Sequence, residues 1–264
     1  MPLSRDALIR YSRQLRLPEL GLAGQERLAA SRVLVVGAGG LGSACAPYLA
    51  ASGVGELIIA DADAVELSNL HRQLLHTTAD IGRRKVDSAR EHLGRLNPEV
   101  RITALPARMD ADTLAAALDG CDAVVDGSDN FATRFAVNAA SRARGIPLVS
   151  AAAIRFDGQL SVFDPRDAAS PCYRCLYRDS AEAAETCAMN GVLPPVVGGA
   201  ALLFAFGRRG LLGGPVYDAT GFLLPFSIWG VVAANTALAG ALTQPAAFAV
   251  AAAADVAPVA AGGR

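Results

Sequence analysis

Three glycines, Gly37, Gly39 and Gly42, form a G-x-G-x-x-G pattern that follows an aliphatic run and opens an alanine-rich segment. Glycines at this spacing let a phosphate approach the backbone N–H groups at the N-terminus of a helix. Asp61 ends a second aliphatic run, where an acidic side chain can accept hydrogen bonds from a ribose. The pattern predicts a mononucleotide or dinucleotide site. A tight strand-to-helix turn with a capping acid is the structural alternative.

Positive charge follows this segment at Arg72 and Lys85. Lys85 is the single lysine beside 23 arginines, which suggests a position where a compact ammonium is needed instead of a planar guanidinium. Fixed cations near a glycine loop suit a triphosphate, whose charge must be neutralised before an anion can attack it. The alternative is a solvated helix face, as for most exposed cations.

A second acidic cluster runs from Asp126 to Asn130, just after a short aliphatic run. In the usual strand order of a doubly wound sheet, this run neighbours the first strand, so the cluster faces the glycine loop. Asp129 can there hold Mg²⁺ on the phosphates, because Mg²⁺ takes one or two carboxylates together with phosphate oxygens. A helix N-cap at Asp129 is the alternative.

Strands and helices that would position these residues alternate along the chain. We expect strands at 33–36, 56–60, 100–104, 123–125 and 147–150, and helices at 79–95, 110–118 and 132–143. A further, alanine-rich helix should follow the glycine cluster and run to about Ser52. This alternation predicts an α/β fold with a Rossmann-like, doubly wound and mostly parallel sheet. Asp157-Gly158 is a hairpin signal between 151–156 and 159–163, so antiparallel strands should extend the sheet. Two helices, broken at Pro18 and Gly21, are expected over 5–31.

Composition limits the functional classes. A net charge of −1 and a pI near 6.3 give no global basic excess for nucleic acid. Five cysteines, an odd number, and an N-terminus without an apolar signal segment predict a cytoplasmic protein. The charge-free stretch 219–254 raises the question of a membrane span, but its glycines, Pro225 and Asn235 argue against one. We expect one domain over 1–245 and an Ala-rich tail over 246–264.

The motifs together resemble the MoeB/ThiF/HesA adenylyltransferases, which are related to ubiquitin-activating enzymes. In chain order they are Gly-Ala-Gly-Gly-Leu-Gly, Ser-Asn-Leu-His-Arg-Gln, the lysine after Gly82, Asp-Gly-Ser-Asp-Asn, Pro-Cys-Tyr-Arg-Cys and Thr186-Cys187. The resemblance covers about residues 11–195, with a weak echo at 217–219. It implies ATP-dependent adenylation of the C-terminal glycine of a small ubiquitin-like sulfur-carrier protein that ends in Gly-Gly.

The resemblance also implies roles for individual residues. Gly40 and Asp61 would hold the nucleotide, and Asn69, Arg72 and Lys85 the phosphates. Arg13 matches an arginine that the family supplies across a dimer interface, so a homodimer is expected. The expected nucleotide site is Gly37, Gly39, Gly40, Gly42, Asp61, Ser68, Asn69, Arg72, Lys85, Asp129 and Asn130; the expected catalytic residues are Arg13, Arg72, Lys85, Asp129 and Cys187.

Cys172 and Cys175 form a C-x-x-C, which is half of a tetrahedral zinc shell. The family completes this shell with a second C-x-x-C near its C-terminus, and this sequence has none. Zinc is therefore expected to be absent, or shared by two pairs across a dimer axis. Cys187 matches a family cysteine that takes part in sulfur transfer or thioester formation in some members, and accident is the alternative here.

The expected activity is thus ATP-dependent adenylation of a sulfur carrier with release of pyrophosphate, in molybdopterin, thiamine or related biosynthesis. An NAD-dependent oxidoreductase is one alternative, which would use the glycine loop and Asp61 but leave Arg72, Lys85 and Asp129 unexplained. A nucleotide-binding partner protein without turnover is the other. The unusual, apolar C-terminal part motivates it.

Overall fold

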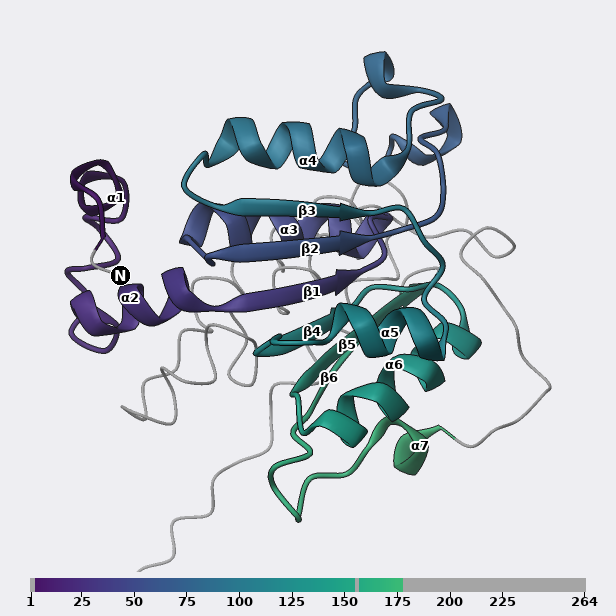
Figure 1. Ribbon diagram of the computed structural model, residues 1–264. Coiled ribbons are helices and arrows are strands. Elements are labelled where there is room, and N and C mark those ends of the chain that lie inside the picture. Colours follow the sequence, from purple (N-terminus) through teal and green to yellow (C-terminus); the bar gives the residue numbers. More distant parts are fainter. Residues whose placement is uncertain (1–2, 155–156, 178–264) are drawn as a thin grey trace, which may run out of the picture.

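The computed structural model describes residues 3–154 and 157–177 of the 264-residue chain. Its centre is a six-stranded sheet with the order β3-β2-β1-β4-β5-β6 (Figure 1). Strands β1 to β5 pair in parallel, and β5 pairs with β6 in the antiparallel sense. The strands are β1 Arg32–Val36, β2 Glu56–Ala60, β3 Arg101–Leu105, β4 Ala123–Asp126, β5 Leu148–Ile154 and β6 Asp157–Phe163. This is the predicted mixed, Rossmann-like sheet, and β4 neighbours β1 as expected.

Helices cover both faces of the sheet. Those of the described residues are α1 Arg5–Arg10, α2 Gly21–Ala30, α3 Gly40–Ser52, α4 Lys85–Leu96, α5 Ala111–Ala117, α6 Phe131–Arg144 and α7 Tyr173–Leu176. The apolar side chains of α3 and α4 pack on one face, and those of α5, α6 and α7 pack on the other. Right-handed crossovers between parallel strands require this division into two layers.

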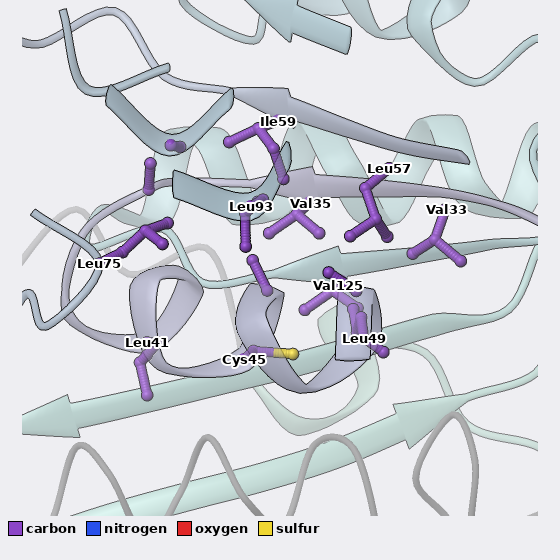
Figure 2. Close-up of a cluster of buried hydrophobic side chains, with 14 of the residues drawn as sticks. Val33, Val35, Leu41, Cys45, Leu49, Leu57, Ile59, Leu75, Leu93 and Val125 are labelled. Atoms are coloured by element: carbon purple, nitrogen blue, oxygen red, sulfur yellow. The ribbon is translucent and has the colours of Figure 1, made fainter. Parts of the chain in front are cut away.

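Strand β1 shows why the sheet is buried on both sides. Val33 and Val35 face the cluster beneath α3 and α4, whereas Leu34 and Val36 face the opposite cluster. Figure 2 shows the first cluster, in which side chains of β1 and β2 face α3, the helix that carries Cys45 and Leu49. Successive side chains of a strand point to opposite faces, so a strand buried on both faces must be aliphatic throughout.

The predicted position of the hairpin turn, at Asp157-Gly158, is wrong. The expected strands at 147–150 and 151–156 form a single strand, and Asp157 and Gly158 lie within β6 instead of in a turn. The observed register places Val149 opposite Val162, both on the face covered by α3. A register centred on a 157–158 turn would place a charged residue, Arg166, opposite Val149. Burial of the apolar face therefore outweighs the local turn signal.

Helix α4 begins later than predicted. The expected helix at 79–95 is divided, because a short 3-10 turn at Thr78–Asp80 is closed by reciprocal hydrogen bonds between Thr77 and Asp80. Gly82 then takes a φ of 84°, which ends helical geometry. As a result Lys85 becomes the first residue of α4.

The two N-terminal helices are present as predicted, separated by turns over 11–20. Predictions for Cys187, for 217–219, for the domain boundary at 245 and for the tail at 246–264 lie outside the described residues. Within 3–154 and 157–177, every helix is too short or too polar to cross a membrane.

Candidate functional site

A cavity of about 410 Å³ opens at the carboxyl ends of β1, β2 and β4, where the glycine loop meets the acidic loop after β4. It brings together nine of the predicted nucleotide-site residues. These are Gly37, Gly39, Gly40, Asp61, Asn69, Arg72, Lys85, Asp129 and Asn130. Ligands of doubly wound sheets bind at this end, where the strand order reverses.

The glycine loop is tight because backbone segments touch. Gly37 has a φ of 90°, and a Cβ there would lie 3.0 Å from the carbonyl oxygen of Gly127. At Gly42 a Cβ would lie 1.7 Å from the carbonyl oxygen of Gly37. Gly42 does not line the cavity, so its place in the motif is explained by close packing of the loop.

This contact leads to a stability prediction. Gly42→Ala should lower the free energy of unfolding by about 3 kcal/mol, because the added methyl group meets backbone that cannot rotate away. Gly94→Ala is the matched control, since nothing lies within 4 Å of a Cβ at this position of α4. It should stabilise the protein by about 0.5–1 kcal/mol, since glycine is a poor helix former. Denaturant unfolding measures both, and equal effects would contradict the packing argument.

Ala38, at the centre of the glycine loop, is held on both sides. Its N–H donates to Asp61 Oδ2 at 2.7 Å, and its carbonyl oxygen lies 3.1 Å from His76 Nε2. His76 in turn contacts Ser88 Oγ of α4 at 2.9 Å. Burial lowers the pKa of His76, and nearby Lys85 lowers it further. The imidazole of His76 therefore links the glycine loop to α4, a role that no sequence motif indicates.

Asp61 has a mixed electrostatic environment. Burial raises its pKa, while the Lys85 charge and the N–H groups of Asp63 and Ala38 oppose the rise. Each carboxylate oxygen accepts one backbone hydrogen bond, from Asp63 and from Ala38. Because each oxygen has a second lone pair, Asp61 can still accept bonds from ribose hydroxyls.

Cations form one wall of the cavity. The ammonium of Lys85 lies 2.8 Å from Asp63 Oδ2, and the Lys85 side chain is only 7% exposed while that of Asp63 is 68% exposed. The Arg72 guanidinium donates to Asn69 Oδ1 at 3.1 Å. The cavity wall therefore holds a buried ammonium and a side-chain-positioned guanidinium, an arrangement that suits several phosphate groups.

The loop after β4 forms the opposite wall. Asp126 is fully buried, accepts from the Ser128 N–H at 3.0 Å, and has a pKa that burial raises. The Arg134 guanidinium donates twice to the Ser128 carbonyl oxygen, at 2.7 and 3.2 Å. Asp126 and Arg134 therefore fix the loop from beneath.

Asp129 and Asn130 stand at the rim of this loop. Asn130 is the N-cap of α6 and accepts from the Thr133 N–H at 2.9 Å. The alternative assignment of Asp129 as the N-cap is therefore wrong. Its carboxylate is exposed and accepts a 3.4 Å hydrogen bond from the side-chain amide of Asn130. A carboxylate that is free of capping and faces a phosphate cavity fits the ligand chemistry of Mg²⁺.

Of the predicted nucleotide-site and catalytic residues that the structure describes, three do not line the cavity. One is Gly42, discussed above. Ser68 instead donates to Glu66 Oε2 at 3.2 Å. Arg13 lies beside Gln14, whose side chain donates to the carbonyl oxygen of Ser52 at the C-terminal end of α3. Because the cavity adjoins the other end of this helix, about 18 Å away, Arg13 cannot reach the cavity of its own chain.

The structure adds cavity residues that the sequence reasoning did not select. They are Asp63, Gln73, Arg108, Met109, Ser128 and Arg134, among others. Asp63 could have been found, because it stands two residues after Asp61 at the end of the same strand. Arg134 follows the acidic loop by one helical turn. Arg108 and Met109 carry no local signal, because only the fold brings the segment after β3 to the cavity.

Cys172 and Cys175 are near each other, with their sulfurs 3.5 Å apart. Among residues 3–154 and 157–177, no group of three or more His, Cys, Asp or Glu side chains is arranged to hold a metal. A structural zinc site needs four ligands. The described donor set therefore does not fit zinc.

Comparisons with known proteins agree on one family. The sequence model of the ThiF family matches residues 11–234 of this chain. Molybdopterin-synthase adenylyltransferase of Escherichia coli is 49% identical over 196 residues, covering 74% of this chain and 78% of that protein. Sulfur carrier protein adenylyltransferase of Thermus thermophilus is 45% identical and covers 80% of each chain.

Solved structures show the same fold. The tRNA N6-threonylcarbamoyladenosine dehydratase of Escherichia coli, in complex with ATP, superposes with a TM-score of 0.56 at 29% identity. That match covers 60% of this chain and 65% of that protein.

Proposed function

This chain belongs to the ThiF family, and from that premise we propose that it adenylates the C-terminal glycine carboxylate of a small sulfur-carrier protein. The reaction uses ATP and releases pyrophosphate. Similar proteins carry names such as sulfur carrier protein adenylyltransferase and ThiS adenylyltransferase, which supports a ubiquitin-like carrier as the partner. The proposal rests on one observation: the glycine loop, Arg72, Lys85 and Asp129 all line the same cavity.

The glycine loop and Asp61 would bind the nucleotide. The loop presents backbone N–H groups at the N-terminus of α3, where partial positive charge favours phosphate. Asp61 would accept the ribose hydroxyls through the lone pairs that Ala38 and Asp63 leave free. Both groups are held by the sheet, so the nucleotide would be oriented before the carrier arrives.

The reaction itself requires charge neutralisation and alignment. An oxygen of the carrier's terminal carboxylate attacks the α-phosphorus in line, and the bond to the bridging oxygen breaks as pyrophosphate leaves. Lys85 and Arg72 would offset the negative charges of the ATP phosphates and of the carrier's carboxylate, and Asn69 would orient Arg72. Asp129 would hold Mg²⁺, which supplies further positive charge to the phosphates when bound.

Two alternative functions make different demands on the cavity. An NAD-dependent oxidoreductase needs no buried ammonium and no exposed carboxylate beside the phosphates. A binding protein without turnover does not need two cations and a carboxylate around its nucleotide. In this chain Arg72, Lys85 and Asp129 all line one cavity. Carrier-dependent exchange of pyrophosphate into ATP separates the proposal from both alternatives.

We also propose that the enzyme is a homodimer in which Arg13 serves the partner's site. Arg13 and the cavity of the same chain lie at opposite ends of α3, so a contribution from Arg13 would have to come from a second copy. Figure 1 shows the segment between α1 and α2 beyond the amino end of β1, opposite to the strand ends that bear the cavity.

Mixing two inactive variants tests this arrangement. Arg13→Ala and Lys85→Ala should each be inactive alone, but a hybrid dimer restores one complete site. An equimolar mixture after full subunit exchange should therefore regain about a quarter of wild-type activity, because half of the dimers are hybrids with one working site each. Subunit exchange is verified with two affinity tags. No recovery despite exchange would refute the assignment of Arg13 to the partner's site.

A further inference from the structure

The C-x-x-C pair places two thiols together, and no third His, Cys, Asp or Glu of the part of the chain that the structure describes joins them to form a metal shell. Cys172 precedes α7 and is 8% exposed, whereas Cys175, within α7, is exposed. The two sulfurs are 3.5 Å apart, and the Cys175 N–H donates to the Cys172 carbonyl oxygen at 2.9 Å. One thiol is therefore accessible to a reactant, and the other lies directly behind it.

The backbone that carries the pair is anchored. The N–H of Tyr173 donates to Asn138 Oδ1 of α6 at 2.9 Å. The Tyr173 ring meets Phe135 edge-on with centroids 5.5 Å apart, and Phe163 of β6 at 6.1 Å. The two sulfurs thus stay close without further ordering of the chain, which raises the effective concentration of one thiol at the other.

The remaining cysteines do not supply a tetrahedral set of four sulfurs. Cys45 is buried in the cluster beneath α3, on the opposite face of the sheet from Tyr173. Cys121 donates its thiol hydrogen to the Ala117 carbonyl oxygen at 3.2 Å. Since the sequence has five cysteines, only Cys187 is left, and one chain can gather at most three sulfurs at this position.

We propose that Cys172 and Cys175 are a redox-active dithiol that undergoes thiol–disulfide exchange with a small disulfide such as glutathione disulfide. This goes beyond the adenylation activity and does not depend on it. A pair of adjacent thiols suits such exchange, because the exposed thiol can meet the oxidant and the neighbouring thiol can resolve the mixed disulfide.

The exchange balances in two steps. The thiolate of Cys175 attacks one sulfur of the oxidant, a mixed disulfide forms, and the other half leaves as a thiolate that takes up a proton. The sulfur of Cys172, after losing its proton, then attacks Cys175 and expels the second thiol. The protein loses two hydrogen atoms and the oxidant becomes two thiols. A final sulfur–sulfur bond of about 2.05 Å requires only a small approach of the two side chains.

The test uses the full-length protein, treated with a chelator and equilibrated with defined ratios of reduced to oxidised glutathione. Thiols are then blocked with an alkylating reagent, and disulfides are mapped by peptide mass spectrometry. We expect the thiol count of the unfolded chain to fall from five to three as the pair oxidises. Cys187→Ser should still form the Cys172–Cys175 disulfide, whereas Cys172→Ser should stop at a mixed disulfide with glutathione on Cys175.

Three results would overturn the proposal. The pair could stay reduced even in pure oxidised glutathione, or the mapped disulfide could join Cys187 to one of the two. Metal analysis before chelation supplies the third, because one zinc per chain, or one per two chains, would identify the sulfurs as metal ligands. The mapping is done on the wild-type chain, so a variant that fails to fold does not affect the decision.

Discussion

Replacing Lys85 by alanine should lower the rate of adenylate formation by about 100- to 1000-fold, the cost of losing one charge-stabilising group at a reaction centre. Lys85 is the only lysine of the chain, and its ammonium lies on the cavity wall with its side chain 7% exposed. No other ammonium can replace it. Carrier-dependent exchange of labelled pyrophosphate into ATP, at saturating ATP, measures the loss.

Two further variants separate charge from geometry at this position. Lys85→Arg keeps the positive charge but changes a compact group to a planar one, and should recover only part of the activity. Asp63→Asn removes the partner of Lys85 but keeps the ammonium, so its effect should be smaller than that of Lys85→Ala. The melting temperature should change little in Lys85→Ala, because Asp63 is largely exposed and can be solvated. An exchange rate within about threefold of wild type would refute the role of Lys85.

Replacing Asp129 by alanine should cause a loss of the same order, because this carboxylate is the proposed Mg²⁺ ligand at the phosphates. The fold should be unaffected, since Asp129 is exposed and does not cap α6. Exchange activity over a range of Mg²⁺ concentrations measures the effect. Activity that remains close to wild type at every Mg²⁺ concentration would contradict the assignment.

Two other substitutions serve as controls for Asp129→Ala. Asn130→Ala removes the N-cap of α6 and should lower the free energy of unfolding by about 1 kcal/mol, which Asp129→Ala should not do. Asp119→Ala removes an exposed carboxylate that meets Arg144 at 3.5 Å, away from the cavity. It should leave both activity and stability nearly unchanged. If Asp129→Ala lowers the exchange activity without lowering the free energy of unfolding, and Asp119→Ala lowers neither, the lost activity reflects a lost catalytic contribution of Asp129.

Much of the fold could be predicted because its signals are local. Aliphatic runs at β1 and β2 are buried on both faces, and the glycine pattern between them is typical of a tight strand-to-helix turn. The hairpin was predicted in the wrong register because the turn signal at Asp157-Gly158 is local, whereas the register depends on apolar partners such as Val149 and Val162. Packing across strands cannot be read from one segment.

The residues of the candidate site also fall into two groups, those with a local sequence signal and those without one. Residues within short motifs, such as Asn69, Arg72 and Asp129, could be selected from spacing, and the cavity contains them. Groups that act through tertiary contacts could not. His76 reaches Ala38 across 38 residues, and its role as a link between the glycine loop and α4 appears only when the chain is folded.

The central claim is that this cavity joins ATP to the terminal glycine of a sulfur carrier. It is tested most directly by incubating the protein with ATP, Mg²⁺ and ubiquitin-like carriers that end in Gly-Gly, and weighing the carrier by mass spectrometry. We predict a carrier that gains one adenylate group, together with pyrophosphate exchange, and neither product when the two terminal glycines are deleted. Adenylate on the truncated carrier, or no adenylate on any intact carrier while the protein binds ATP, would contradict the account.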